Sequence, residues 1–408
     1  MRVYVIGGGA AGMMSAICAR RRGFDVTILE RNEKTGKKLF ITGKGRCNLT
    51  NNSPVQNLID NTVRNGKFLF GAFRNFDSEK CMDFFEELGV PLKTERGNRV
   101  FPVSDKSSDV IAALNNEIKK LGIEVKLHQR VIDFAVNKNT ISEIITEKGR
   151  YADVGYVILA TGGFTYPATG STGDGYRLAS IVGHTVVDPV PSLCDIILKE
   201  STAEIRGLSL KNVACSVFKG EKKLYSEFGE MLFTDNGVGG PCVLSLSARI
   251  CRSDFAGMKF EIDLKPALSE ETLKARVQRD FDAQNNKAIK NVLPALLPKS
   301  LIPVVLDRAK ISGEKQCNAV TKAEKTQLIN VLKHLTFTVL GCEKDRAVIT
   351  AGGIKTDEIS PKTMRSKLCD NLAFAGEIVD VDAMTGGYNL QIAFATGYAA
   401  GNNVEING

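Results

Sequence analysis

The fold is decided by residues 3–31, VYVIGGGAAGMMSAICARRRGFDVTILER. The apolar residues 3–6 predict a buried parallel strand, and Gly7, Gly9 and Gly12 follow it with GxGxxG spacing. In such a motif the first glycine permits a tight turn, the second lets the backbone approach a pyrophosphate, and the third lets the next helix lie close to the strand. The sequence therefore predicts a dinucleotide-binding turn between a strand and a helix.

The elements after this turn extend the prediction. A helix over residues 11–22 points its positive dipole end at the phosphates, and Gly23 ends it. A second strand over residues 25–29 runs into Glu30, whose carboxylate can accept both hydroxyls of an adenosine ribose. An acid here argues against a 2′-phosphate and so against NADP as the resident ligand, which leaves FAD or NAD. The candidate contacts in this unit are Gly7, Gly9, Ala10, Ala11, Gly12, Glu30 and Arg31.

Length, cysteine spacing and charge limit the class of protein. The chain has 408 residues, which suffices for two or three domains. It contains no apolar run of membrane-spanning length, no secretory signal and no CxxC pair, so we expect a cytoplasmic protein without a metal site. Of its formal net charge of +8, most lies in residues 1–50, with ten Lys/Arg against three Asp/Glu, and residues 264–336, with thirteen against seven. This charge belongs either to a solvated helical surface or to the footprint of a polyanion such as RNA.

Residues 34–51, KTGKKLFITGKGRCNLTN, are rich in glycine and lysine. They predict an extended loop that leaves the ribose site and runs along the cofactor, where Asn48 and Thr50 hydrogen-bond a flavin ring edge. Cys47 lies next to Arg46, whose charge could lower the pKa of the thiol. Alternatively, Cys47 is a small residue packed beside the ring. The candidate phosphate contacts of this loop are Lys37, Lys38, Lys44 and Arg46.

The middle of the chain predicts an insertion. Runs of β-forming residues at 131–136, 141–146 and 151–159 indicate an antiparallel meander, whose last strand ends in glycines that can approach the cofactor. No second GxGxxG follows, and the chain becomes first β-rich and then helical, with a capping box at Thr321. The predicted parts are residues 1–190 and 346–408 for the cofactor-binding domain, 191–264 for a β-rich inserted domain, 265–336 for a helical inserted domain and 337–345 for a return strand.

Several stretches together resemble one family, the flavoproteins of the BaiN and YhiN type within the two-dinucleotide-binding-domain flavoprotein group. The matching pieces lie in order along the chain and include GGGAAG, GKKLFITGKGRCNLTN, GNRVFPVSDKSSDV, ATGGFTYPATGSTGDGY, GEMLFTDNGVGGP and FAGEIVDVDAMTGGYNLQIAFATG. The resemblance implies an α/β fold, with a Rossmann-like FAD-binding domain of glutathione-reductase type and a β-rich plus helical insertion. It also implies reduction of activated carbon–carbon double bonds. Members of the family are associated with dihydrouridine in large-subunit ribosomal RNA and with conjugated bile-acid enones.

The resemblance also implies further cofactor contacts. The Gly376-Glu377 pair looks like a second flavin signature, with Glu377 at the ribityl chain. Gly387 opens a helix whose positive end faces the N1/C2 edge of the flavin and stabilises the anionic reduced form. The three histidines lie outside every glycine motif, so we expect noncovalent FAD. The remaining implied contacts are Val131, Ala160, Thr161, Gly162, Gly163, Asp174, Gly386, Tyr388, Asn389 and Leu390.

Three functional hypotheses remain open at this point. The leading one is FAD-dependent reduction of uridine to dihydrouridine in large-subunit ribosomal RNA, with NAD(P)H as a transient electron donor. The second is reduction of a small conjugated enone such as a bile-acid or steroid-like substrate, and the third is a flavin-dependent RNA-binding factor without turnover. Reduction of a C=C bond needs a positioned acid, for which Cys47 is the first candidate and Tyr166 the reserve. The sequence leaves the oligomeric state open.

Overall fold

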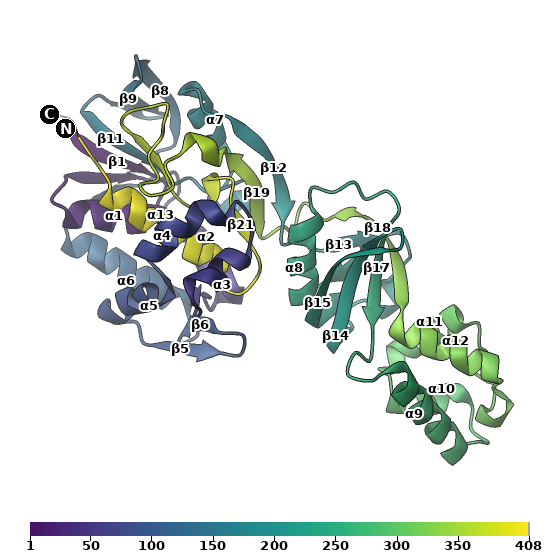
Figure 1. Cartoon of the computed structure of the whole chain (residues 1–408). Coiled ribbons are helices and arrows are strands. Elements are labelled where there is room, and N and C mark those ends of the chain that lie inside the picture. Colours follow the sequence, from purple (N-terminus) through teal and green to yellow (C-terminus); the bar gives the residue numbers. More distant parts are fainter. Residues whose placement is uncertain (407–408) are drawn as a thin grey trace. The chain divides into compact units, whose positions relative to one another are not determined.

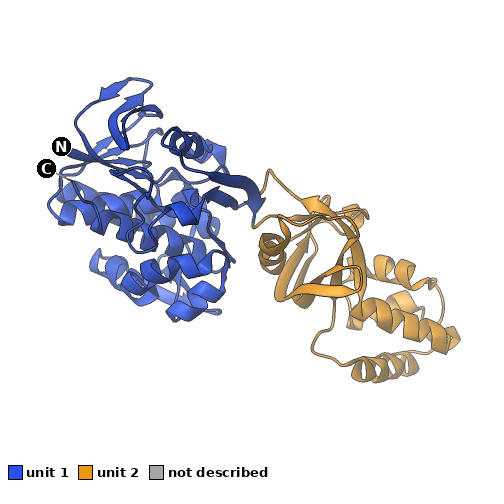
Figure 2. Cartoon of the chain, turned by 45° about the horizontal axis from the view of Figure 1, so that its top comes forward, with its two compact units in different colours: residues 1–192, 347–408 blue, residues 193–346 orange. Residues whose placement is uncertain are grey.

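The protein folds into two compact units (Figure 2), and the computed structural model describes residues 1–406. Unit 1 comprises residues 1–192 and 347–408, and unit 2 comprises residues 193–346. The chain thus leaves unit 1 and returns to it close to the predicted boundaries at 190/191 and 345/346. Residues 193–346 form a single unit, so the finer separation of β-rich, helical and return-strand domains stays a prediction.

Unit 1 is built on a five-stranded parallel sheet with the order β20-β11-β1-β2-β7. The first strand, β1, is central, and Val3 pairs with Val26 on one side and Tyr156 on the other. Its residues after Arg2 are buried because both faces of such parallel sheets are covered, which explains the continuous apolar run in the sequence. This sheet is of Rossmann type, as predicted. Its strands are β1 (Arg2–Ile6), β2 (Val26–Leu29), β7 (Glu124–Lys126), β11 (Val154–Leu159) and β20 (Leu372–Phe374).

Two helices from opposite ends of the chain pack together in this unit (Figure 1). They are α1 (Ala10–Arg21) and α13 (Tyr388–Asn402). Small residues allow the close approach, because a Cβ atom at Gly397 would lie 2.5 Å from the carbonyl oxygen of Ala11. A Cβ atom at Gly401 would lie 2.3 Å from the carbonyl oxygen of Ser15. The C-terminal segment therefore completes the domain that the N-terminal fingerprint begins.

Two local predictions were wrong. The expected strand over residues 151–159 is two strands that belong to different sheets. The first, β10 (Gly149–Tyr151), pairs in an antiparallel sheet with β9 (Thr140–Thr146), which pairs in turn with β8 (Val131–Asn137). The second, β11, joins the parallel sheet. The backbone turns between them at Asp153, whose carbonyl oxygen accepts a hydrogen bond from the backbone N–H of Arg2. The expected extended loop over 34–51 contains the short helix α2 (Lys37–Ile41) and a 3₁₀ turn. Gly36 adopts φ +73° and starts this helix, which buries Leu39.

Unit 2 has its own hydrophobic core and consists of a closed barrel with helices, most of which lie between its last two strands in sequence. The barrel order is β13-β16-β15-β14-β17-β18, and α8 packs on β15. The predicted capping box is confirmed at the start of α12, where Thr321 and Glu324 exchange hydrogen bonds. The strands are β13 (Ile196–Leu198), β14 (Ser209–Lys219), β15 (Lys222–Phe233), β16 (Gly237–Gly239), β17 (Met258–Asp263) and β18 (Leu335–Cys342), and the helices are α8 (Pro241–Ile250), α9 (Glu270–Ala283), α10 (Ile289–Val292), α11 (Ile302–Ala309) and α12 (Lys322–Lys333).

The remaining elements of unit 1 surround the central sheet. Strands β12 and β19 pair with each other and carry the chain to and from unit 2. No helix within residues 1–406 is both long and apolar enough to cross a bilayer. The remaining elements are α3 (Val55–Asp60), α4 (Phe70–Asn75), α5 (Ser78–Glu87), α6 (Ser107–Lys120), α7 (Asp174–Ile181), β3 (Thr50–Asn51), β4 (Thr62–Arg64), β5 (Leu92–Glu95), β6 (Arg99–Pro102), β12 (Val186–Ser192), β19 (Ile349–Ile354) and β21 (Asp382–Ala383).

Candidate functional site

The three fingerprint glycines have different surroundings that match the roles of the motif. Gly7 adopts φ +104°, and a Cβ atom there would lie 2.5 Å from the carbonyl oxygen of Ala160. A Cβ atom at Gly12 would lie 1.9 Å from the carbonyl oxygen of Gly7, so only glycine lets α1 lie this close to the turn. A Cβ atom at Gly9 would meet nothing within 4 Å. The open side of the turn is therefore at Gly9, where a pyrophosphate is expected.

The polar groups at this turn suit a dinucleotide. No side chain caps the first turn of α1, so its backbone N–H groups can serve a phosphate. Glu30 is only 6% exposed, and its Oε2 atom accepts a hydrogen bond from Gly8 N at 2.7 Å. Its Oε1 atom accepts from Asn32 N at 2.8 Å and from Asn32 Nδ2 at 2.7 Å. These donors fix the carboxylate, and each ionised oxygen can accept further bonds from a ribose.

The second signature lies against the first. A Cβ atom at Gly376 would be 2.8 Å from the Cβ atom of Ala11, which places the 3₁₀ turn at residues 376–378 beside the start of α1. The turn after β11 lies here too, through the contact between Gly7 and Ala160. Two hydroxyls of the following segment, Thr161 Oγ1 and Ser171 Oγ, are buried without a hydrogen-bond partner among the described residues. The structure thus brings together segments that are hundreds of residues apart in sequence, with polar atoms left for a ligand.

An ion pair joins the lysine-rich segment to the second signature. Lys38 Nζ lies 2.6 Å from Glu377 Oε2 and 2.9 Å from Thr165 Oγ1. The other carboxylate oxygen, Glu377 Oε1, accepts a hydrogen bond from Thr350 N at 2.7 Å. Lys38 therefore neutralises Glu377 and is not a free cation. Sequence reasoning missed Thr165 and Thr350, and the only signal for Thr165 was its position inside the matching stretch ATGGFTYPATGSTGDGY.

The predicted flavin-edge residues hold the start of α13. Thr50 is fully buried and donates from Oγ1 to Gln391 Oε1 at 2.6 Å. In the amide orientation that satisfies both of its polar atoms, Asn48 accepts from Gly387 N at 3.0 Å. Asn389 accepts from Ala383 N at 3.0 Å. These side chains bond to protein groups and fix the first turn of α13, which no side chain caps.

Arg46 and Cys47 differ from their predicted roles. The Arg46 guanidinium lies 2.5 Å from Glu95 and 2.6 Å from Asp105, and it stacks over Phe101 at 4.1 Å. Its charge is therefore directed at two carboxylates. Cys47 is fully buried, and burial raises the pKa of its thiol to about 12. The prediction that Arg46 lowers the pKa of Cys47 was wrong, because desolvation decides the protonation of this thiol.

The other candidate residues lie in separate segments of unit 1. Tyr166 is 39% exposed and follows Thr165 of the ion-pair cluster. Asp174 begins α7 and pairs with Arg130 at 2.8 Å and with Arg31 at 2.9 Å, and its bond to Arg130 lowers the pKa of the carboxyl group. Arg31 is thus paired with another candidate contact. Val131 is buried at the start of β8, and Leu390 lies in the first turn of α13.

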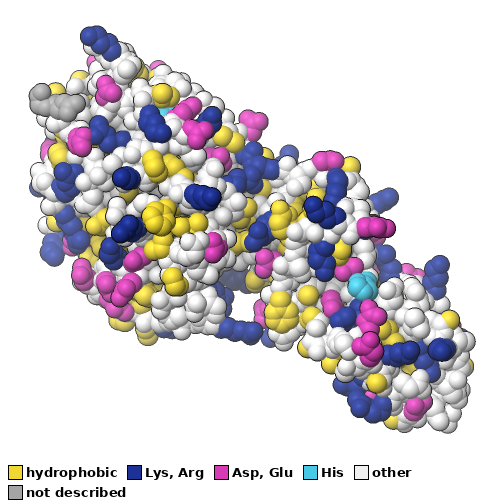
Figure 3. All heavy atoms as spheres, in the orientation of Figure 1, with side chains coloured by type: hydrophobic (Ala, Val, Ile, Leu, Met, Phe, Trp, Pro, Cys, Tyr) yellow, Lys and Arg dark blue, Asp and Glu magenta, His cyan; other side chains and the backbone are white. Residues whose placement is uncertain are grey.

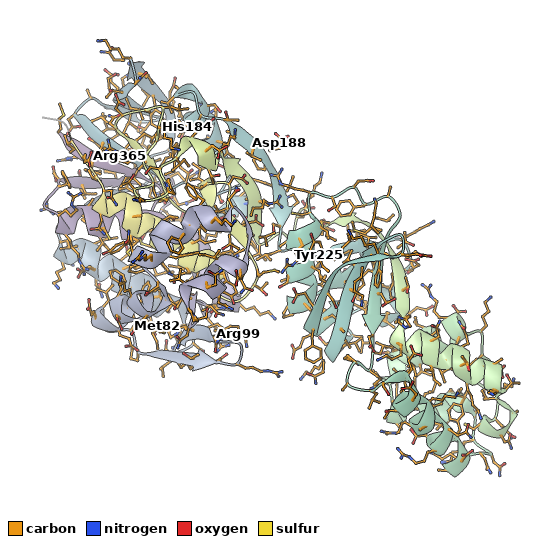
Figure 4. The ribbon with its side chains drawn as sticks, viewed as in Figure 1. Met82, Arg99, His184, Asp188, Tyr225 and Arg365 are labelled. Atoms are coloured by element: carbon orange, nitrogen blue, oxygen red, sulfur yellow. The ribbon has the colours of Figure 1, made fainter. Side chains whose placement is uncertain are left out.

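His184, which Figure 4 labels, is buried and belongs to a separate polar cluster. Its Nδ1 atom lies 3.2 Å from Glu358 Oε2, and its Nε2 atom lies 2.7 Å from Ser366 Oγ. Burial lowers the pKa of His184, and Glu358 opposes this shift only in part. Among residues 1–406, no group of three or more His, Cys, Asp and Glu side chains is placed to hold a metal ion.

The parallel sheet, the open fingerprint turn, the buried acid beside it and the second signature define a flavin-dependent oxidoreductase of Rossmann type. Solved structures agree on the fold. A 3-ketosteroid-Δ4-(5α)-dehydrogenase from Rhodococcus jostii superposes with a TM-score of 0.52 at 15% identity, covering 98% of this chain and 95% of the other. An open flavocytochrome c3 fumarate reductase gives a TM-score of 0.53 at 18% identity over 98% of this chain and 77% of the other.

The chain belongs to the family described as HI0933-like protein Rossmann domain, whose model matches residues 1–403. A 3-dehydro-bile acid Δ(4,6)-reductase from Clostridium scindens is 32% identical over 98% of both chains. A ribosomal RNA dihydrouridine synthase from Haemophilus influenzae is 28% identical over 98% of both chains. Its namesake from Escherichia coli is 27% identical over 98% of this chain and 97% of the other. These relatives confirm the family resemblance found in the sequence.

Proposed function

We propose that this protein reduces a carbon–carbon double bond conjugated to a carbonyl group, with uridine in large-subunit ribosomal RNA as the substrate. The observation that carries the chemistry is the convergence of the fingerprint, Glu30 and the second signature on one open turn. Two relatives of nearly full coverage that are named ribosomal RNA dihydrouridine synthases support the substrate. A cytoplasmic enzyme follows from this substrate.

The charge of unit 2 also supports an RNA substrate. Several exposed cations in its helical part make no ion pair among the described residues, whereas Lys290 pairs with Glu314 and Lys315 pairs with Glu324. Unpaired cations are free to neutralise phosphates, and paired cations are less so. The positive charge available to RNA is therefore smaller than the sequence suggests, but it is present. The unpaired cations are Lys274, Arg279, Lys287, Lys299, Lys310 and Lys322.

The cofactor of this proposal is noncovalent FAD, which when bound supplies the hydride for the electron-poor carbon. Glu30 and the N-terminus of α1 hold its adenosine and pyrophosphate parts. The first turn of α13, which no side chain caps, would offer N–H groups to the edge of the flavin where negative charge develops. NAD(P)H is the proposed transient electron donor.

The proton for the second carbon has two candidate sources. Tyr166 is 39% exposed and directly follows Thr165, which bonds to Lys38 of the Lys38–Glu377 pair, so a substrate can reach its side chain. Cys47 is fully buried in the core, where its thiol is kept neutral but has no surface to offer a substrate. We therefore propose Tyr166 as the acid and Cys47 as a packing residue of the loop.

A second candidate function is reduction of a small conjugated enone. The bile-acid reductase has the highest identity of the three relatives described above, and its substrate carries the same kind of activated double bond. The two substrates are chemically equivalent at the reacting bond, so the residues at the flavin do not discriminate between them. Selection must come from surfaces that bind the rest of the substrate.

Deleting the gene in its host tests the proposal. Loss of one dihydrouridine from large-subunit ribosomal RNA, restored by the wild-type gene, is the expected result. Purified holoprotein supplied with NADH or NADPH should then form dihydrouridine in a transcript of this RNA. An unchanged RNA modification profile, together with turnover of a steroid-like enone by the purified holoprotein, would refute the RNA substrate and support reduction of a small enone.

A further inference from the structure

An exposed patch of unit 1 combines aromatic, aliphatic and basic side chains. Phe40 is 51% exposed at the end of α2, and Ile41 next to it is also exposed. Val103, which follows β6, is 54% exposed. Exposed apolar groups of this size gathered in one region commonly mark a binding surface. Figure 3 shows hydrophobic side chains interspersed with lysine and arginine on the face of unit 1 in view.

Phe101 joins the parts of this patch. The Arg46 guanidinium lies 4.1 Å from the centre of its ring, and the Arg99 guanidinium lies 5.8 Å from it. The turn after α2 also contacts it, because a Cβ atom at Gly43 would lie 3.5 Å from the ring. Arg99 is labelled on β6 in Figure 4. The turn after α2 and the β5–β6 hairpin are therefore neighbours on one surface.

The charge of this surface is strongly positive. Residues 33–51 and 92–106 together carry nine Lys/Arg against three Asp/Glu. Each of these acids is already paired, since Glu33 binds Lys37, and Glu95 and Asp105 bind Arg46. The cations that remain exposed and make no ion pair among residues 1–406 are Lys34, Lys44, Arg96, Arg99 and Lys106.

We infer that α2, the turn after it and the β5–β6 hairpin form a docking surface for a single-stranded segment of RNA, an inference that rests on the proposed RNA substrate. Phe40 offers a ring face on which a base stacks, and Lys34 lies 5.8 Å over the same ring. Arg96, Arg99 and Lys106 contact phosphates. Aromatic side chains set among unpaired cations are the combination by which proteins hold single-stranded nucleic acid.

Two variants separate the parts of this surface. Phe40→Ala removes the stacking face, so RNA affinity should fall roughly 5- to 150-fold with an unchanged salt slope, because stacking releases no counterion. The triple variant Arg96→Gln, Arg99→Gln and Lys106→Gln removes three phosphate contacts. It should lower the slope of log K against log salt by about 2.

The probe is a transcript of large-subunit ribosomal RNA, titrated with FAD-loaded full-length protein at several salt concentrations. The control variant carries Lys138→Gln, Lys148→Gln and Arg150→Gln, which removes the same charge from exposed positions of the β8–β10 sheet. Flavin content and reduction by the electron donor should be unchanged in every variant, and Phe40→Tyr should retain affinity.

The outcomes distinguish this inference from the function on which it rests. If the wild type binds and modifies the transcript while both test variants match the control, the docking surface is refuted and the RNA substrate stands. If the wild type neither binds nor modifies RNA but reduces a soluble enone, the proposed RNA substrate is refuted, and the docking surface that rests on it is refuted as well. Weaker RNA binding by both test variants, with the control at wild-type affinity, supports the surface.

Discussion

Replacing Glu30 by glutamine tests how the adenosine half of the cofactor is held. The carboxylate is buried and accepts bonds from Gly8 N and from both nitrogens of Asn32. Glutamine keeps the size of the side chain but turns one acceptor into an NH₂ donor. That NH₂ group must then face either a protein N–H group, with which it forms no hydrogen bond, or a ribose hydroxyl whose hydrogen bond the carboxylate would accept.

The loss of protein bonds affects the free and the loaded protein alike, so it largely cancels in the binding free energy. The loss of a charged acceptor for the ribose does not cancel, and it is worth about 1.5–3 kcal/mol. The dissociation constant for FAD should therefore be roughly 10- to 150-fold higher in Glu30→Gln than in the wild type. Titrating the apoprotein with FAD and following the quenching of flavin fluorescence measures this change.

Two controls make the result specific. Glu33→Gln removes the same charge three positions away, where the side chain is exposed and pairs only with Lys37, so its FAD affinity should match the wild type. FMN lacks the adenosine ribose, so Glu30→Gln should bind FMN as the wild type does. Equal FAD affinity in the two variants, or an equal loss for FMN and FAD, would refute the assignment of Glu30 to the ribose.

Three further predictions concern the proton donors and the buried histidine. Tyr166→Phe should retain flavin and its reduction but lose roughly 10²–10⁴-fold in product formation per flavin, and full product formation would remove Tyr166 as the acid. Cys47→Ala should release FAD more readily while product per bound flavin stays near the wild-type value; normal flavin content with lost turnover would instead make Cys47 the acid. Because burial lowers the pKa of His184, the unfolded chain binds its proton first as pH falls below about 6.5, and folding stability decreases there. The free energy of unfolding, measured with denaturant between pH 7.5 and 5.5, should change by at most about 1.4 kcal/mol per pH unit because of this group. His184→Gln should lack this change, and identical pH profiles of the two proteins would contradict the prediction.

Local chemistry made the core of the fold predictable. The close approach of Gly12 to Gly7 and the capping box at Thr321 each depend on residues within one or two turns of chain, and both have the predicted local geometry. Glu30 lies at the end of the next strand and bonds to Gly8 of the fingerprint. The insertion was predictable from the missing second fingerprint. The helix α2 was missed because its start depends on the left-handed conformation of Gly36 and on burial of one leucine, and neither is visible in a stretch with few apolar residues.

Long-range pairing explains what the sequence could not predict at the site. The partner of Lys38 is 339 residues away, and the partners of Arg46 are 49 and 59 residues away. A cation in a glycine-rich loop looks the same in sequence whether it faces a phosphate or a carboxylate. The protonation of Cys47 was mispredicted for a related reason, since a neighbour in sequence was weighed and burial was not.

The pairing of α1 with α13 determines when unit 1 can complete its fold during synthesis. Strand β20 and helix α13 belong to residues 347–408, so synthesis reaches them only after about 150 residues of unit 2 have emerged. At about 5–20 residues per second this takes roughly 8–30 s. Throughout that interval the apolar side of α1 lacks its covering helix, while unit 2 can already form its own core. The nascent chain therefore waits for its last segment before it can retain a flavin, which makes truncation near the C-terminus far more damaging than its distance from the fingerprint suggests.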